Sequence, residues 1–149
     1  MARPFRFRLE RLLEVRRLRE DLAGRELALA RRAAEEQEAL VRGLAGEAEA
    51  QKAARRGLQG RGELDLSRIR RHGDYQAAVE GRLETATRRL EELTRAEAAR
   101  RRALVEARKG VKVLDRFRER RLLEHARGES RREQKELDEA ARGSAPGTT

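Results

Sequence analysis

In the segment IRRHGDYQAAVEGRLETATRRLEEL, residues 69–93, apolar side chains recur every three or four positions from Val79 to Leu93, in phase with Ile69, and no proline interrupts the chain from there to residue 142. This spacing lines up apolar side chains on one face of a helix, in a seven-residue repeat. In that repeat the a positions are 69, 76, 83, 90, 97, 104 and 111, and the d positions are 72, 79, 86, 93, 100, 107 and 114. The pattern predicts one helix over residues 66–142 that packs lengthwise against another helix.

The preceding part of the chain supplies the predicted partner helix, over residues 4–58. Pro4 suits a first helical position, where its missing N–H has no partner within the helix. The apolar residues that we expect on one face are Phe5, Leu9, Leu12, Val15, Leu18, Leu22 and Leu29, then Ala33, Leu40, Leu44, Ala54 and Leu58 after a shift of phase near residues 29–37. Such a shift relaxes a supercoil locally without ending the helix.

A cluster of three glycines, Gly57, Gly60 and Gly62, separates the two predicted helices. Because glycine disfavours a helix by about 1 kcal/mol per residue, the cluster predicts a turn over residues 59–65. Either Asp65 or Ser67 can cap the helix that follows. The short turn should fold the second helix back along the first.

The predicted fold is therefore all-α, with two long helices in an antiparallel coiled-coil hairpin and the second helix longer. It forms a single domain over residues 1–143, followed by a disordered tail over 144–149. Residue i should face roughly residue 124 minus i, which places Phe7 near Phe117. Beyond about residue 120 the second helix should project without a partner.

Composition supports extended helices, because 43% of the 149 residues are charged and only 3% are aromatic. Such a chain has little material for a globular core, and disorder of the whole chain is the alternative that the sustained periodicity disfavours. The chain has no cysteine, which excludes disulfides and thiolate metal sites. We expect neither a signal peptide nor a membrane-spanning helix, because no long uncharged apolar run occurs.

The net charge of +10 is concentrated in residues 3–19 and 108–121, each with seven basic and two acidic residues. The hairpin would place these stretches side by side as one positive collar at its open end. Basic side chains that simply extend into water around a thin interface are the alternative. A basic coiled coil can also bind nucleic acid or act as a scaffold, although stacking aromatic residues and recognisable nucleic-acid modules are missing.

No catalytic or metal site is evident in the sequence. His72 and His125 are the two histidines, and they lack the spacing of metal ligands. His72 occupies a d position, where a partly buried interface residue is the better explanation. Acidic residues alternate with arginines at helical spacing, as on a solvated helix surface. We therefore expect neither an enzyme nor a cofactor.

Three segments carry a resemblance to a known family. FRFRLERLLEVR at residues 5–16 resembles an N-terminal F-x-L-x-x-L-L-x-x-R pattern, and Tyr75, Val79, Leu83 and Ala86 resemble its steps early in the second helix. ESRREQKELDEAA at residues 129–141 resembles the closing R-x-E-Q-K-x-L-D-E pattern, whose polar spacing no coiled coil requires. The chain thus resembles the FliJ family, small coiled-coil components of the bacterial flagellar type III export apparatus.

The resemblance implies a stalk-like, monomeric protein with no nucleic-acid partner, located in the cytoplasm and at the inner face of the cell membrane. It would bind the hexameric flagellar export ATPase, the cytoplasmic region of the export gate protein and export chaperones, and so serve protein export, flagellum assembly and motility. Carried over by position, the ATPase-binding residues are Arg8, Arg11, Arg16, Arg131, Gln134, Lys135, Asp138 and Glu139.

The same resemblance implies that Tyr75, Val79, Arg82 and Ala86 bind the export gate. Val79, Leu83 and Ala86 also fit the interface between the two helices, which is the assignment that we favour. Tyr75 lies off the a and d positions and is the stronger candidate for contact with a partner.

Overall fold

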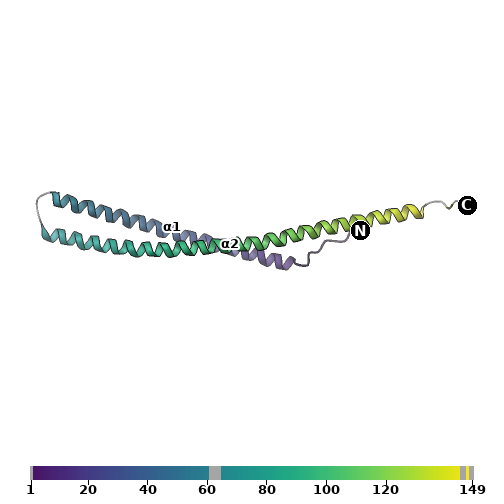
Figure 1. Cartoon of the computed structure of the whole chain (residues 1–149), viewed down its shortest axis with the longest axis horizontal. Helices are drawn as coiled ribbons and strands as arrows, with labels where there is room; N and C mark the ends of the chain where they lie inside the picture. Colours follow the sequence, from purple (N-terminus) through teal and green to yellow (C-terminus); the bar gives the residue numbers. More distant parts are fainter. Residues whose placement is uncertain (1, 61–64, 145–146, 148–149) are drawn as a thin grey trace. The chain divides into compact units, whose positions relative to one another are not determined.

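A computed structural model describes residues 2–60, 65–144 and 147, and within these ranges it contains two helices and no strand (Figure 1). Helix α1 spans Glu10–Gly60 and helix α2 spans Leu66–Gly143. The all-α class and the longer second helix are confirmed. Residues 61–64 of the predicted turn, and 145, 146, 148 and 149 of the predicted tail, lie outside the described residues.

Helix α1 begins at Glu10, six residues later than the start predicted at Pro4. The described residues before it are not helical, and the Glu10 N–H donates to the Phe7 carbonyl at 3.2 Å as the helix begins. The reason is that Phe5 and Phe7 both pack against α2, with His125 and Phe117. Residues two apart point the same way in an extended chain and to different sides of a helix.

Helix α2 is capped by Asp65, one of the two predicted candidates. Its carboxylate accepts the N–H of Ser67 at 3.1 Å and of Arg68 at 3.4 Å. The Asp65 carbonyl accepts the first helical hydrogen bond, from the Ile69 N–H at 3.1 Å. These contacts satisfy backbone donors that have no partner within the helix, which fixes where α2 begins.

The chain divides into two compact units. Unit 1 joins Met1–Asp21 to Val105–Thr149, and unit 2 is Leu22–Leu104. Each unit pairs a segment of α1 with a segment of α2 (Figure 1).

In unit 2 the contacts between the helices run in opposite directions along them. Glu26 pairs with Arg100 at 2.7 Å, Gln37 Nε2 donates to the Ala86 carbonyl at 3.0 Å, and Gln51 contacts His72 at 3.3 Å. The helices are therefore antiparallel in this unit, and the partner of residue i lies within a few residues of 124 minus i. His72 is half-buried in the interface, as its d position predicts.

Unit 1 is antiparallel as well. Glu10 pairs with Arg118 at 3.1 Å, Arg17 with Asp115 at 3.0 Å, and Glu20 with Arg108 at 3.7 Å. The predicted neighbours Phe7 and Phe117 are confirmed, with ring centroids 5.8 Å apart.

The seven-residue repeat predicted for α2 is the buried face of that helix. Its a and d positions include the buried residues Val79, Ala86, Leu104 and Val111. The remaining a and d residues are half-buried, except Arg100, which is exposed and pairs with Glu26. The sequence therefore predicted both the direction and the length of this interface.

The face predicted for α1 is wrong over most of its length. Its expected members Leu12, Val15, Leu18, Leu22, Leu29 and Leu40 are all exposed, by 41% to 67%. The buried residues are Leu13, Leu27, Ala34 and Ala48, which repeat at multiples of seven without a shift of phase. A strict seven-residue repeat in α1 can stay in contact with the strict repeat of α2 for many turns. The predicted leucine face is more hydrophobic, but it loses its phase near residue 29.

Two leucines test this assignment, because Leu13 is 0% exposed and Leu18 is 67% exposed. We expect Leu13→Ala to lower the free energy of unfolding by about 2–4 kcal/mol, since it removes buried methyl groups and leaves a cavity. Leu18→Ala should change it by less than about 0.5 kcal/mol. Urea denaturation followed by circular dichroism measures both. Equal losses would contradict the buried face described here.

Candidate functional site

The chain segment before α1 lies along α2 in unit 1. The Phe5 and His125 rings lie 5.6 Å apart, and His125 Nε2 is 2.9 Å from the Arg3 carbonyl, to which its N–H can donate. The guanidinium of Arg118 lies 6.0 Å from the Phe5 ring centre. With Phe7 and Phe117, this cluster contains all three phenylalanines of the chain.

This segment corrects the prediction that α2 projects alone beyond about residue 120. Ala2 and Arg3 share a pocket with Glu129, Arg132, Glu133 and Glu136. From residue 130 to residue 144 every residue of the chain is exposed. The unpaired end of α2 is therefore shorter than predicted, because the N-terminal segment takes the place of the missing helix over nearly three turns.

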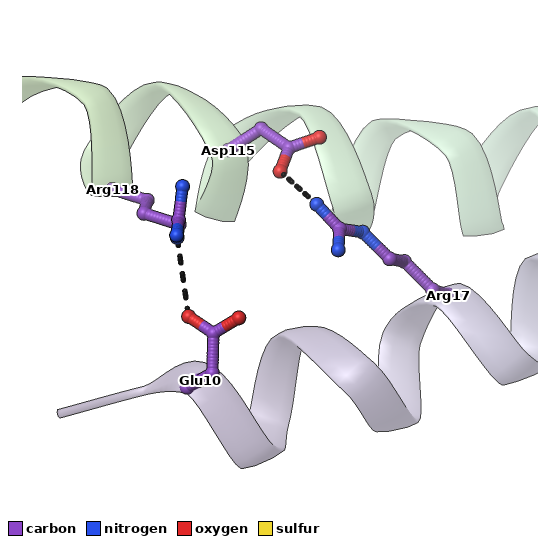
Figure 2. Close-up of polar contacts among 4 residues, drawn as sticks. All are labelled: Glu10, Arg17, Asp115 and Arg118. Atoms are coloured by element: carbon purple, nitrogen blue, oxygen red, sulfur yellow. Dashed lines mark hydrogen bonds and ion pairs between the residues drawn. The ribbon is translucent and has the colours of Figure 1, made fainter. Parts of the chain in front are cut away.

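The two basic stretches lie side by side within unit 1, as the hairpin predicted. Figure 2 shows Glu10 with Arg118 and Arg17 with Asp115, two ion pairs that cross from α1 to α2. The collar is thus partly neutralised by acids of the opposite helix. Among the described residues, no acidic partner pairs with the following basic residues: Arg6, Arg8, Arg11, Arg16, Arg19, Lys112, Arg116 and Arg120.

The predicted ATPase-binding residues all belong to unit 1 and fall into two groups. Arg8, just before α1, and Arg11, in its first turn, are exposed, and Arg16 is half-buried beside Gly110. The second group is exposed on the last turns of α2: Arg131, Gln134, Lys135, Asp138 and Glu139. Its spacing of three, four and seven residues places most of these side chains on one helix face. None of the five takes part in a side-chain hydrogen bond or ion pair within the described ranges.

The predicted gate-binding residues belong to unit 2, and only two of the four are on its surface. Val79 is 0% and Ala86 is 6% exposed, which agrees with the favoured assignment to the helix interface. Tyr75 is 44% exposed, and Arg82 is also exposed. A partner could reach Tyr75 and Arg82 without separating the helices.

Tyr75 is held by a hydrogen bond across unit 2, from its hydroxyl to the Glu47 carboxylate. This hydrogen bond raises the pKa of the phenol, and the negative charge of Glu47 raises it further. A phenolate would lose the hydrogen bond and be repelled by the carboxylate. The contact is therefore complete below the ordinary pKa of 10.0 and is lost as pH rises through the higher pKa of the folded chain.

A groove between the two helices of unit 2 was not predicted from the sequence. Its lining residues come from both helices of unit 2 and are Gln37, Leu40, Leu44, Ala78, Gly81, Arg82, Thr85, Ala86 and Arg89. Small residues at 78, 81 and 85, spaced as one helix face, were the available signal. It was missed because Leu40 was assigned to the interface, whereas it is 50% exposed at the groove.

No group of histidine and acidic residues in the described ranges could hold a metal ion. None of the helix residues that were searched forms a stretch apolar and long enough to span a bilayer.

Comparison with protein families finds one whose model, described as flagellar FliJ protein, matches residues 5–145. The chain belongs to this family. The match covers both helices and the segment before α1 from Phe5 onward, so it includes every residue predicted above to bind the ATPase or the export gate. Curated proteins and solved structures gave no match. Membership makes the chain a component of the flagellar export apparatus.

Titration of Tyr75 tests the contact with Glu47. It is the only tyrosine, and tryptophan is absent, so phenolate absorbance reports this residue alone. We expect a midpoint above 10.0 in the folded chain, and a lower midpoint in Glu47→Ala. Glu47→Gln keeps a hydrogen-bond acceptor and removes the charge, so its titration midpoint should fall between those of the natural chain and of Glu47→Ala. The same midpoint in all three chains would contradict the contact.

Proposed function

We propose that this chain is the stalk-like component of the flagellar export apparatus that binds the hexameric export ATPase through unit 1. In this proposal it couples the ATPase to the export gate, assists the delivery of chaperone-bound substrates, and has no catalytic activity of its own. It acts as a monomer in the cytoplasm and at the inner face of the cell membrane. The observation that carries the proposal is the exposed, charged last part of α2 in a chain of this family.

The charged residues on this part of α2 are better suited to binding a specific partner than to attracting any oppositely charged surface. Arg131 and Lys135 stand beside Asp138 and Glu139, so both signs occur within two turns. A partner with complementary charges gains contacts only in one alignment, and a shift along the helix brings like charges together. Such a pattern supports binding at a defined position in a ring-shaped partner.

Contacts between the segment before α1 and α2 support a helical conformation of the exposed end of α2. A helix with no tertiary contacts frays, because nucleation of a helix costs free energy and each added residue stabilises it only slightly. The contacts of Phe5 and Arg3 with His125 anchor α2 only a few residues before its exposed end begins. The proposed binding face is thus a direct continuation of a packed helix.

For the export gate we propose a contact through Tyr75 and Arg82 in unit 2. Both are exposed, and Arg82 lines the groove between the helices. An aromatic ring that is already held by a hydrogen bond loses little conformational entropy on binding. Val79 and Ala86 would support this surface from beneath.

Charge reversal tests the proposed ATPase contact. We expect Lys135→Glu combined with Asp138→Lys to weaken binding to the cognate export ATPase by about tenfold or more, because several exposed charges then face like charges. Helicity should not change, since both side chains are exposed and unpaired in the described structure. A pull-down and the stimulation of ATP hydrolysis measure the effect.

The matched control is the reversed pair Glu84→Arg with Arg88→Glu, which exchanges an exposed ion pair of α2 in unit 2. It should bind the ATPase normally. An unchanged affinity of the Lys135/Asp138 variant would contradict the site. Duplex DNA binding that survives about 200 mM salt would instead favour a nucleic-acid-binding protein.

Tyr75→Ala and Arg82→Ala should each weaken capture of the cytoplasmic region of the export gate protein, because both remove exposed contacts of the proposed surface. Binding to the ATPase should stay the same, since its proposed site is in the other unit. Thr87→Ala is the control, because Thr87 is an exposed residue of α2 that does not line the groove. Equal capture of all three variants would contradict the proposal.

A further inference from the structure

Unit 1 has a groove of its own between α1 and α2. Its lining residues are Leu12, Arg16, Glu106, Lys109, Gly110, Val113 and Leu114. Leu12 and Val113 are 41% and 66% exposed, which is unusual for apolar residues on opposite sides of one groove. Gly110 supplies no side chain, and the Arg16 side chain lies over it, with its Cδ 3.7 Å from where a Cβ of residue 110 would be.

The apolar surface extends from this groove around α1. Val15 and Leu18 follow Leu12 at intervals of three residues and are 43% and 67% exposed. At helical spacing, Arg11 and Arg19 lie on the same side of the helix. Three of the four acidic residues of this segment, Glu10, Glu14 and Asp21, lie on another side of the helix, and the fourth, Glu20, pairs with Arg108 of α2 at 3.7 Å.

The cations beside the groove are mostly without acidic partners. Arg16 and Arg19 pair with no acid among the described residues, and neither do Arg116 and Arg120, which share a helix face with Val113. Lys109 is the exception, because it pairs with Glu106 at 3.1 Å. The groove is thus an apolar strip flanked by arginines that form no ion pair within the described part of the chain, and its one acidic lining residue, Glu106, pairs with Lys109.

We infer that this groove binds an acidic amphipathic helix of a partner protein. Apolar side chains of such a helix would cover Leu12, Val15 and Val113, and its acidic flanks would face the arginines. A second copy of this chain would bring two basic surfaces together, which is unfavourable. Duplex nucleic acid would neutralise the arginines but leave the apolar strip in water.

This inference does not rest on the proposed ATPase contact, whose test uses residues at the end of α2. Arg11 and Arg16 take part in both, but the groove is defined by Leu12, Gly110 and Val113. A test with a synthetic peptide needs neither the ATPase nor the gate. Its failure would leave the proposed function untouched.

Gly110 offers a way to close the groove without damaging the fold. A Cβ added there would lie 3.7 Å from the Cδ of Arg16, which is an ordinary contact. A longer side chain at this position would meet the Arg16 side chain, which also lines the groove, and would fill part of the groove beside Val113. Replacing a glycine within a helix also favours the helical conformation, so Gly110→Met should fold at least as well as the natural chain.

The probe is a fluorescein-labelled synthetic helix with leucine at its a and d positions and glutamate at its e and g positions. Its counterpart carries lysine in place of glutamate. We expect the glutamate peptide to bind the full chain with a micromolar Kd in fluorescence anisotropy. Gly110→Met and Val113→Gln should weaken binding by about tenfold or more, whereas Gly43→Met, an exposed glycine of α1 in unit 2, should not.

Three results would overturn the inference. The first is equal binding of the glutamate peptide to the natural chain and to Gly110→Met, which would indicate general attraction to a basic surface. The second is equal binding of the lysine peptide. The third is a dimer in sedimentation equilibrium that Gly110→Met dissociates, which would assign the groove to a second copy.

Discussion

The interaction on which the structure depends is the contact between one narrow face of α1 and one narrow face of α2. Eight residues are buried among those described, four on each helix, and three of them are alanines. The ion pairs between the helices are partly exposed to solvent, and such pairs contribute about 1 kcal/mol or less each. Agreement of the two repeats over many turns therefore has to supply most of the specificity of pairing.

That dependence explains why the sequence predicted one helix better than the other. In α2 the apolar residues fall on a single face, so Val79, Ala86, Leu104 and Val111 were correctly placed. In α1 two faces compete, and the more hydrophobic one, with Leu18 and Leu22, is exposed. Hydrophobicity shows which helix faces would gain from burial. The face that is buried is the one whose repeat has the same period as the repeat of the partner helix.

The candidate sites divide in the same way. The exposed end of α2 and the neighbours Phe7 and Phe117 could be predicted from the repeat of α2 and the antiparallel direction, whereas the binding role of that end was expected only from the family resemblance. The N-terminal segment could not, because Pro4 is compatible with a helix start and the contact of Phe5 with His125 is tertiary. The groove at Gly110 depends on the phase of α1, so its recognition required the structure.

Because Tyr75 is hydrogen-bonded to Glu47, its fluorescence reports on the contact between the two helices of unit 2. The phenol is the only strong native fluorophore, because the chain has no tryptophan. A nearby carboxylate quenches tyrosine emission, so the signal should brighten when the two helices of unit 2 separate locally and Tyr75 leaves Glu47. A conformational change confined to unit 1 would leave Tyr75 beside Glu47, so its fluorescence would stay quenched. Spectroscopy without any attached dye can thus distinguish opening of one unit from changes in the other.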